Sequence, residues 1–587
     1  MRTSKSTVVL AGAAVAALVV SGCGGGNGGG GSAGKAPAYN AGITGVVNPS
    51  EQTGGTVVYQ LSSTPDSMDP GNTYYGFMWN FSRVYARALT TFNAAPGTAG
   101  LKLVPDLAAE LGKPSDNGKT WTYHIRPGLK FSDGTPITTK DVKYGIERSN
   151  YAPEVMSNGP TYFNAYLVNN TPEYQGPYKD KTGNLKSIET PDDTTIVFHL
   201  SQPFADFDYL VSNPQTAPVP QAKDTGADYV KNVISSGSYM FQSYQDGKGA
   251  TLVRNPHWSA SSDPIRKQLP DKITVQFNIA QTTVDQNLIA GNATMDLAGA
   301  GIAAQSQAAA LSNPTQKGHI DDAQSGALAY VAISTAVKPF DNVHCRKAVE
   351  YAVDKVSAQT ATGGDIHGDI ATTILPPTVS GHVTYDLYKT PDYKGANSPE
   401  GLAAAKNELS QCGHPGGFST NLSARADRPN EIAIAQAVQA SLKKVGISVG
   451  IQQYPSGKYF TDNAGAPAFV HSHGLGLMMM AWAADWPTGY GFLQQIIDGG
   501  AIKASGNSNL SELNNPAINK MLDDAIGNTD NTARIEAWGD IDKAAMEQAP
   551  LVPLLYRKDP LYRPDHATNV FVTEAYGMYD YLNVGVQ

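Results

Sequence analysis

The sequence predicts an α/β protein with more than one domain, and three features support this prediction. The chain has 587 residues, which exceeds the usual size of a single hydrophobic core, so about two or three domains are expected. Residues 56–61 read Thr-Val-Val-Tyr-Gln-Leu, a β-branched run typical of a strand. Residues 120–126 alternate as a strand does, and a capped helix is expected to begin near Thr138 or Thr139.

The composition describes a soluble globular protein without the basic surface that nucleic acid requires. Hydrophobic residues make up 41% of the chain, charged residues make up 16%, and the formal net charge is -9. Proteins that bind nucleic acid carry a positive patch for the phosphate backbone, so nucleic acid is not an expected partner. After the N-terminal segment, no apolar run approaches the ~20 residues of a transmembrane helix.

The first residues predict an exported protein with a lipid anchor. Arg2 and Lys5 precede an apolar run over residues 8–20, which is too short to span a membrane. The run ends in Val-Ser-Gly-Cys23, which resembles the signal of bacterial lipoproteins, whose cysteine is acylated after cleavage. The resemblance implies a signal peptide over residues 1–22 and lipidation of Cys23, with an ordinary signal peptide as the alternative. Two or more acyl chains, at ~0.8 kcal/mol per buried methylene, would hold the protein at the outer face of the cytoplasmic membrane.

Residues 23–54 are expected to form a flexible linker. They are dominated by glycine and show no apolar periodicity. About 30 residues of such a chain have an r.m.s. reach of roughly 30 Å, so the protein would work beside the membrane.

Two cysteines remain once Cys23 is lipidated, and they are candidates for a disulfide. Cys345 and Cys412 would lie in an oxidising compartment, where such pairs form. The sequence alone does not give the distance between their Cα atoms, so two free thiols stay the alternative.

One apolar strand ends in an unusual carboxylate. Residues 475–487 read Leu-Gly-Leu-Met-Met-Met-Ala-Trp-Ala-Ala-Asp-Trp-Pro, which is too uniformly apolar for a half-exposed strand. Asp485 stands between two indoles, and an uncompensated buried charge costs several kcal/mol. Asp485 is therefore expected either to cap the helix after Pro487 or to contact a ligand, since ligands of open α/β sheets lie beyond the carboxyl ends of the strands.

Residues 104–148 carry a family signature. They contain Val-Pro-Asp-Leu-Ala-Ala-Glu-Leu, then Arg126-Pro-Gly, Phe131-Ser-Asp-Gly-Thr-Pro and Asp141-Val-Lys-Tyr, in this order. The pattern resembles that of the family 5 extracellular solute-binding proteins of ABC importers, the peptide, opine and nickel-binding group. Further segments resemble the same family, so the likeness covers nearly everything after Gly54; they are residues 235–258, 286–297, 339–355 and 549–556.

The resemblance implies a two-lobed, periplasmic-binding-protein-like α/β fold of the large peptide-binding class (type II), with the ligand enclosed between the lobes. The first lobe would comprise residues 55–73, 222–324 and 552–587, and the second lobe residues 325–551. An extra domain would be inserted in the first lobe over residues 74–221.

The resemblance also implies the function. The protein would be a monomeric receptor that captures short peptides outside the cell and delivers them to an ABC permease and its ATPase, without a cofactor. An oligosaccharide or a nickel chelate is the alternative cargo, because Trp482 and Trp486 can stack on sugars as well as on peptide side chains.

The family's segment around Asp485 implies how a peptide would bind. In relatives the aspartate after the tryptophan takes the free amine of the peptide, and here Trp482-Ala-Ala-Asp485 falls on that position. The backbone of Trp482 and Ala483 would pair with an extended peptide as an added strand. Relatives often carry a second acid directly after this aspartate, whereas this chain has Trp486-Pro487, so part of the charge expected around the amine is missing.

Two further groups are expected at the ligand. Arg425 falls where dipeptide-binding relatives hold the peptide carboxylate, which a guanidinium can bind with two parallel hydrogen bonds. Arg428 competes for this role, and a surface arginine is the alternative. Tyr74, Tyr75 and Gly76 align with the first-lobe loop that contacts the ligand backbone.

An extracytoplasmic hydrolase is the alternative from another class, and the sequence offers little for it. His471 and His473 form a His-x-His, but no acid at ligand spacing accompanies them, so no metal site is expected. The chain lacks a Gly-x-Ser-x-Gly elbow, a Ser-x-x-Lys and a His-Glu-x-x-His motif. No catalytic residues are expected.

Overall fold

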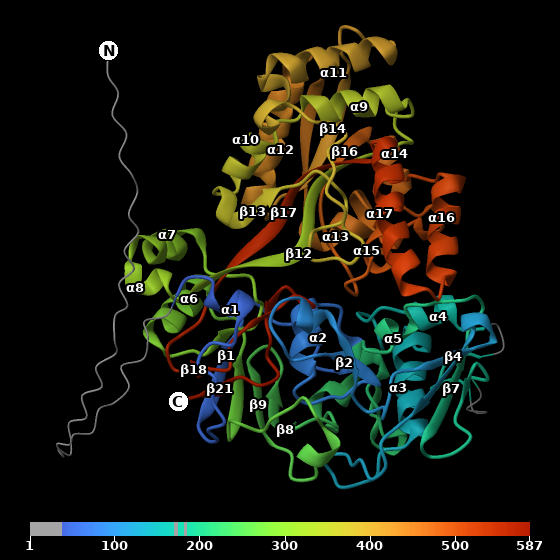
Figure 1. The fold of residues 1–587 in the computed structure, drawn as a ribbon, viewed down its shortest axis with the longest axis vertical. Helices are drawn as coiled ribbons and strands as arrows, with labels where there is room; N and C mark the ends of the chain where they lie inside the picture. Colours follow the sequence, from blue (N-terminus) through green and yellow to red (C-terminus); the bar gives the residue numbers. More distant parts are fainter. Residues whose placement is uncertain (1–37, 169–173, 181–184) are drawn as a thin grey trace, which may run out of the picture. The chain divides into compact units, whose positions relative to one another are not determined.

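The computed structural model describes residues 38–168, 174–180 and 185–587 (Figure 1). The chain divides into two units, Met1–Ala36 and Pro37–Gln587, and every described residue belongs to the second. The predicted signal peptide, Cys23 and the linker as far as residue 37 lie outside the described residues. No helix in the described part of the chain is long and apolar enough to cross a membrane.

The described chain before the first strand contacts the fold, so the predicted linker through Gly54 is too long. The short helix α1 (Ala41–Thr44) lies in this stretch. Asn40 N donates to Ile320 O at 2.9 Å, and Gly42 N donates to Asp321 Oδ1 at 2.8 Å. Glycine content alone did not reveal these bonds, because they join residues about 280 positions apart.

A five-stranded sheet forms the core of the first lobe, in the order β11-β1-β10-β9-β8. Its β1 is parallel to β10 and β11, and β10, β9 and β8 are antiparallel neighbours. The strands are β1 (Thr56–Gln60), β8 (Tyr239–Gln245), β9 (Gly249–Arg254), β10 (Lys272–Gln276) and β11 (Met295–Asp296). Helices α6 (Gln281–Ala290), α7 (Ala304–Ser312) and α8 (Pro314–Lys317) follow in the same part of the chain.

A second, four-stranded antiparallel sheet lies between residues 113 and 199, within the predicted insertion, in the order β4-β5-β7-β6. The strands are β4 (Lys113–Ser115), β5 (Thr120–His124), β6 (Ile188–Glu189) and β7 (Thr195–His199). Helix α3 (Thr139–Tyr151) begins with a capping box in which Thr138 and Asp141 bond reciprocally, which confirms the predicted helix start. The same region holds α2 (Gly76–Ser82), β2 (Thr90–Phe92), β3 (Leu103–Pro105), α4 (Tyr162–Tyr166) and α5 (Phe207–Leu210).

A six-stranded sheet in the order β13-β17-β12-β16-β14-β15 forms the second lobe. The predicted apolar strand is β16, which lies between β12 and β14. The strands are β12 (Ile320–Ile333), β13 (Gly368–Ile370), β14 (Ser419–Arg425), β15 (Ser448–Tyr454), β16 (Leu475–Ala483) and β17 (Leu551–Tyr562).

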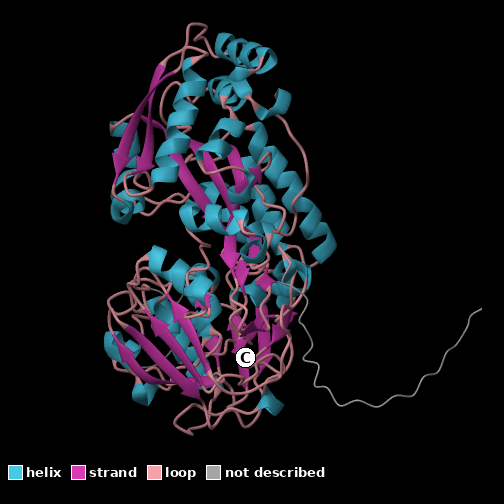
Figure 2. Cartoon of the chain, turned by 90° about the vertical axis from the view of Figure 1, so that its left-hand side faces the viewer, coloured by secondary structure: helices cyan, strands magenta, loops and turns pink. Residues whose placement is uncertain are grey.

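Both faces of β16 are buried from Leu475 to Met480, which explains the uninterrupted apolar sequence there. Met478 and Met480 pack in one hydrophobic cluster with residues of α15 (Gly489–Ile497), α16 (Pro516–Gly527) and α17 (Asn531–Glu547). Leu477 and Met479 pack in another cluster with residues of α9 (Val343–Ala352), α10 (Lys355–Ala361), α11 (Pro399–Gln411) and α12 (Pro429–Lys443). Figures 1 and 2 show the strands of this lobe with helices around them.

The long strands β12 and β17 pass through the predicted lobe boundaries. Their antiparallel ladder is irregular between Gln324 and Leu328, next to the predicted boundary at Ser325. On the returning strand, Val552 and Tyr556 still pair within the six-stranded sheet, so the predicted return to the first lobe at Val552 is several residues too early. A continuous strand carries no turn signal that would mark such a boundary.

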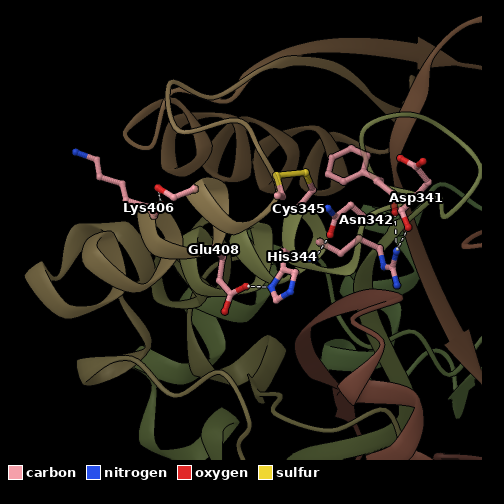
Figure 3. Close-up of a disulfide and its surroundings, with 10 residues drawn as sticks. Asp341, Asn342, His344, Cys345, Lys406 and Glu408 are labelled. Atoms are coloured by element: carbon pink, nitrogen blue, oxygen red, sulfur yellow. Dashed lines mark hydrogen bonds and ion pairs between the residues drawn. A yellow bond between two sulfur atoms is a disulfide. The ribbon is translucent and has the colours of Figure 1, made fainter.

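The predicted disulfide is present in the structure. Cys345 of α9 and Cys412 at the end of α11 are bonded, with a Cα–Cα distance of 5.3 Å (Figure 3). Figure 3 also shows a second link between the two helices, in which His344 Nδ1 lies 2.7 Å from Glu408 Oε2. The disulfide between Cys345 and Cys412 spans 67 residues of the sequence and holds α11 against α9.

Candidate ligand-binding site

A cavity of about 290 Å³ lies at the carboxyl end of β16. Five of the predicted ligand contacts line it, namely Tyr74, Gly76, Trp482, Ala483 and Asp485. We refer to it as the Asp485 cavity. Its walls thus come from the loop before α2 and from the end of β16, which are about 400 residues apart in the sequence.

The carboxylate of Asp485 is half-buried and is bound by two neutral hydroxyl groups. Tyr74 donates to Oδ1 at 2.9 Å, and Tyr162 donates to Oδ2. Burial raises the pKa of Asp485 to about 6, although both tyrosines and the charge of Lys503 lower it. Among the described residues no cation lies within ion-pair distance of Asp485, so the two tyrosine hydroxyls are the only direct partners of its carboxylate there.

Asp485 does not cap the next helix. The N-cap of α15 is Thr488, whose hydroxyl oxygen accepts a hydrogen bond from Gly491 N at 3.2 Å. The backbone N–H of Asp485 donates to Gly491 O at 3.2 Å, which fixes the loop and leaves the carboxylate in the cavity. Of the two alternatives that the sequence left open, the capping role is therefore wrong.

The first-lobe loop places its three residues differently. Tyr74 is 44% exposed and its hydroxyl also lies 2.9 Å from that of Tyr162. Tyr75 is 50% exposed, does not line the cavity, and stacks on Phe77 with a ring distance of 5.2 Å. A Cβ atom added to Gly76 would meet nothing within 4 Å, so packing within the protein does not require glycine there.

The two indoles beside Asp485 have different roles. Trp482 lines the cavity, and its Nε1 donates a hydrogen bond to Phe492 O at 3.0 Å. Trp486 is 4% exposed, does not line the cavity, and donates from Nε1 to Asp206 Oδ2 at 3.1 Å. The expected ligand contact of Trp486 is therefore not found, because its side chain packs inward.

Asp206 is a buried anchor that sequence reasoning missed. It precedes α5 in the inserted region and accepts hydrogen bonds from Trp486 and from Thr488 Oγ1, the latter at 2.5 Å. Arg534 Nε of α17 lies 3.4 Å from its other oxygen. Asp206 thus ties the loop that carries Asp485 to the inserted region. No local motif marked it, because its partners are about 280 or more residues away.

Arg425 and Arg428 line a different cavity, of about 310 Å³, which we refer to as the Arg428 cavity. The guanidinium of Arg425 is already occupied, since Nε and Nη2 both donate to Glu431 Oε2 at 2.8 and 2.6 Å. Arg428 precedes the first residue of α12, and its exposed side chain makes no hydrogen bond or ion pair with any described residue. The structure does not bring either arginine to the Asp485 cavity.

Strand β16 connects the two cavities. Residues 479–481 line the Arg428 cavity, and residues 482–485 line the Asp485 cavity. β14 pairs with β16 only as far as Met478, whereas β12 follows it on the other side as far as Ala483. The edge of β16 that faces β14 therefore has no partner strand beyond Met478 in the described residues.

The two histidines of the His-x-His are engaged elsewhere. His471 Nε2 lies 2.8 Å from Glu512 Oε1, and the ring of His473 stacks on Phe469 at 3.7 Å. Within residues 38–168, 174–180 and 185–587, no group of three or more His, Cys, Asp or Glu side chains is placed to hold a metal ion.

Known proteins of similar sequence and structure point to one family. The family model for the middle region of bacterial extracellular solute-binding proteins, family 5, matches residues 102–503. A probable D,D-dipeptide-binding periplasmic protein of Escherichia coli (strain K12) is 25% identical over 512 residues, covering 85% of this chain and 88% of the relative. Di/tripeptide-binding protein 1 of Pseudomonas aeruginosa (strain UCBPP-PA14) is 25% identical over 549 residues, covering 90% and 94%.

A solved structure agrees over nearly the whole fold. The clavulanic acid biosynthesis oligopeptide binding protein 2 superposes with a TM-score of 0.90 at 41% identity, covering 94% of this chain and 99% of that chain. These likenesses confirm the predicted two-lobed α/β fold class. The chain belongs to the bacterial extracellular solute-binding proteins of family 5.

Proposed function

We propose that this protein is the substrate-binding component of an ABC importer, and that it captures short peptides outside the cell and delivers them to a permease and its ATPase. The observation that carries the proposal is Asp485, a carboxylate in a cavity at the end of a buried strand that has no ion-pair partner among the described residues. A peptide ammonium would supply that cation. Each charge-assisted hydrogen bond it makes is worth about 1.5 to 3 kcal/mol when sheltered from water.

The edge of β16 beyond Met479, whose carbonyl accepts a hydrogen bond from Tyr459 at 2.9 Å, has no partner strand among the described residues, and this supports an extended peptide as the cargo. A peptide laid along this edge would complete the ladder with its own backbone, which gives affinity without selecting side chains. Its amino terminus would lie at Asp485 and its carboxylate in the Arg428 cavity. At ~3.4 Å per residue, the five residue steps from Met480 to Asp485 suit a peptide of about five residues.

Arg428 is better suited than Arg425 to hold the peptide carboxylate. The fork of Arg425 is used by Glu431, so binding a ligand there would break a pair of hydrogen bonds. The guanidinium of Arg428 makes no hydrogen bond with any described residue and stands at the N-terminus of α12, where the helix dipole also favours an anion.

Closure of the lobes follows from the same geometry. The Asp485 cavity is lined from both lobes, by Gly76 and Asp485 among others, so a ligand that contacts both stabilises the closed state by its differential affinity. The absence of a side chain at Gly76 leaves room for the ligand backbone. The closed form would then be the one that the permease recognises.

A sugar oligomer is the second candidate cargo, because aromatic rings line much of the Asp485 cavity. Trp79, Phe92, Trp482 and Tyr576 are among its walls, and aromatic faces pack against the apolar faces of sugars. The family is one of solute-binding proteins, and both relatives named above are peptide-binding proteins, which argues against a hydrolase.

A thermal-shift screen distinguishes these cargoes. Ligand at about 100 times its dissociation constant stabilises the protein by ~2.7 kcal/mol, so short peptides with a free amino terminus should raise the melting temperature. Cello-oligosaccharides and a nickel chelate are the comparison ligands, and a shift with these alone would refute the peptide assignment. The Asp485→Asn variant should lose the peptide shift, while Asp524→Asn, in an exposed pair with Lys520, should keep it.

The lipid anchor at Cys23 is part of the same proposal. A receptor held at the outer face of the cytoplasmic membrane delivers its cargo to a permease in that membrane. Mass spectrometry of the membrane fraction should find acyl chains on Cys23. An unmodified protein in the culture medium would contradict the anchor, and gel filtration checks the expected monomer.

A further inference from the structure

The Asp485 cavity holds a second carboxylate that no described residue neutralises. Glu574 lines the cavity together with Asp485, and no Lys, Arg or His is among the lining residues. From this pairing we infer that the receptor prefers peptides whose first residue is Lys or Arg: the α-ammonium group would lie at Asp485 and the side-chain cation at Glu574. The inference rests on the proposed function and adds the class of peptide.

Glu574 is held in place by the hairpin that carries it. The hairpin joins β19 (Val572–Thr573) to β20 (Met578–Tyr579), and Glu574 is the first residue of its loop. At the end of the loop, Gly577 has φ +64°, and a Cβ atom there would lie 2.4 Å from Ser325 O. This close approach packs the loop against β12, so the position of Glu574 is set by the backbone.

The carboxylate of Glu574 is half-buried, and it makes no hydrogen bond or ion pair with any described residue. Burial alone raises its pKa, and no neighbouring cation lowers it. Arg83 is engaged elsewhere, because Nη2 lies 3.1 Å from Asp580 Oδ2 and the guanidinium covers the ring of Tyr576 at 5.1 Å. A carboxylate in this state favours a cationic ligand over a neutral one.

The remaining walls also suit a cation with an apolar stem. Tyr74 and Trp79 line the cavity as an aromatic pair with ring centres 5.8 Å apart, and Phe92 packs at 5.8 Å against Tyr576, whose ring Arg83 already covers. Aromatic faces attract ammonium and guanidinium groups through their quadrupole, and the methylene stem of Lys or Arg packs on them. A sugar could pack against the aromatic rings, but it would leave the carboxylates of Asp485 and Glu574 without a countercharge.

The size of the cavity limits how much of the peptide it holds. Its volume of about 290 Å³ equals that of about ten water molecules in the liquid. This is room for one long side chain with its amino group, whereas the rest of the peptide would follow β16. The second acid that relatives carry beside the aspartate is thus replaced here by one from the opposite lobe.

Isothermal titration of the full protein tests the inference with pentapeptides that differ only in the first residue, which is Lys, Arg, Leu or Glu. The Lys and Arg peptides should bind about tenfold or more tightly than the Leu peptide. Glu574→Gln should abolish this preference, because it should weaken the binding of the Lys and Arg peptides more than that of the Leu peptide. Glu536→Gln, at an exposed position outside the cavity, is the matched control and should keep the preference.

Three results would overturn the inference: equal affinities of the wild type for the four peptides, a Glu574→Gln variant that still prefers Lys, or a control variant that loses the preference. Should Glu574→Gln not fold, the salt dependence of the wild type decides. The preference for Lys over Leu should shrink as ionic strength rises, and a constant ratio would contradict it. If none of the peptides binds, the proposed function itself fails, which is a separate outcome.

Discussion

The affinity for a peptide with a free amino terminus should fall as the solution is acidified from about pH 7 to about pH 5, because Asp485 must be ionised to bind an ammonium group. Its pKa of about 6 in the unliganded protein places this titration in an accessible range. A peptide α-amino group has a pKa of about 7.7 to 8.0, so the ligand stays protonated throughout.

The magnitude follows from the ionised fraction of Asp485. With a pKa of about 6, the side chain is about nine tenths ionised at pH 7 and about one tenth ionised at pH 5. The bound ammonium lowers the pKa of Asp485 further, so binding releases a proton from the neutral form. The affinity for the peptide is therefore highest above the pKa of the unliganded protein and falls as the pH drops through that pKa. Between pH 7 and pH 5 it should fall by about tenfold.

Isothermal titration with the pentapeptide that begins with Leu, which has no side-chain cation for Glu574, measures the effect over this pH range, and two variants assign it to Asp485. Asp485→Asn should bind weakly with a flat profile, which separates the titration of Asp485 from that of any other group in the same pH range. Tyr162→Phe removes a hydrogen bond that lowers the pKa of Asp485, so its midpoint should move upward. A wild-type affinity that is constant with pH, or the same slope in Asp485→Asn, would refute the reasoning.

Three further predictions concern the elements around the site. Asp206→Ala should lower the free energy of unfolding by about 3 to 5 kcal/mol in a urea titration, because it leaves the buried donors of Trp486 and Thr488 without an acceptor. An equal loss in Asp524→Asn would show that the effect is not specific to this position. Replacing both Cys345 and Cys412 by Ala should lower the free energy of unfolding by about 4 kcal/mol, the loop-closure entropy expected for a separation of 67 residues. An unchanged melting temperature in calorimetry would contradict this. Gly76→Ala should keep the melting temperature but weaken peptide binding, and unchanged affinity in a titration would show that the ligand does not approach this backbone.

Local sequence was sufficient where neighbouring residues decide the structure. The apolar run over residues 475–483 predicts a strand buried on both faces, and β16 is that strand. The start of α3 followed from Thr138 and Asp141, because a capping box depends on residues three positions apart. The family signature extended this to the fold class and pointed to Asp485, but the choice between a helix cap and a cavity residue stayed open.

Only the tertiary structure decided which side chains meet. Trp486 is one residue from Asp485, yet it packs against Asp206 instead of facing the cavity. Glu574 is about 90 residues from Asp485, yet both line the same cavity. A sequence pattern records the chemistry of residues and their local spacing. These are enough to predict strands and helix caps, and to show that an acid stands at the end of an apolar strand. Long-range contacts depend on how the sheets and hairpins are placed in space, and the partner of each charge is set there.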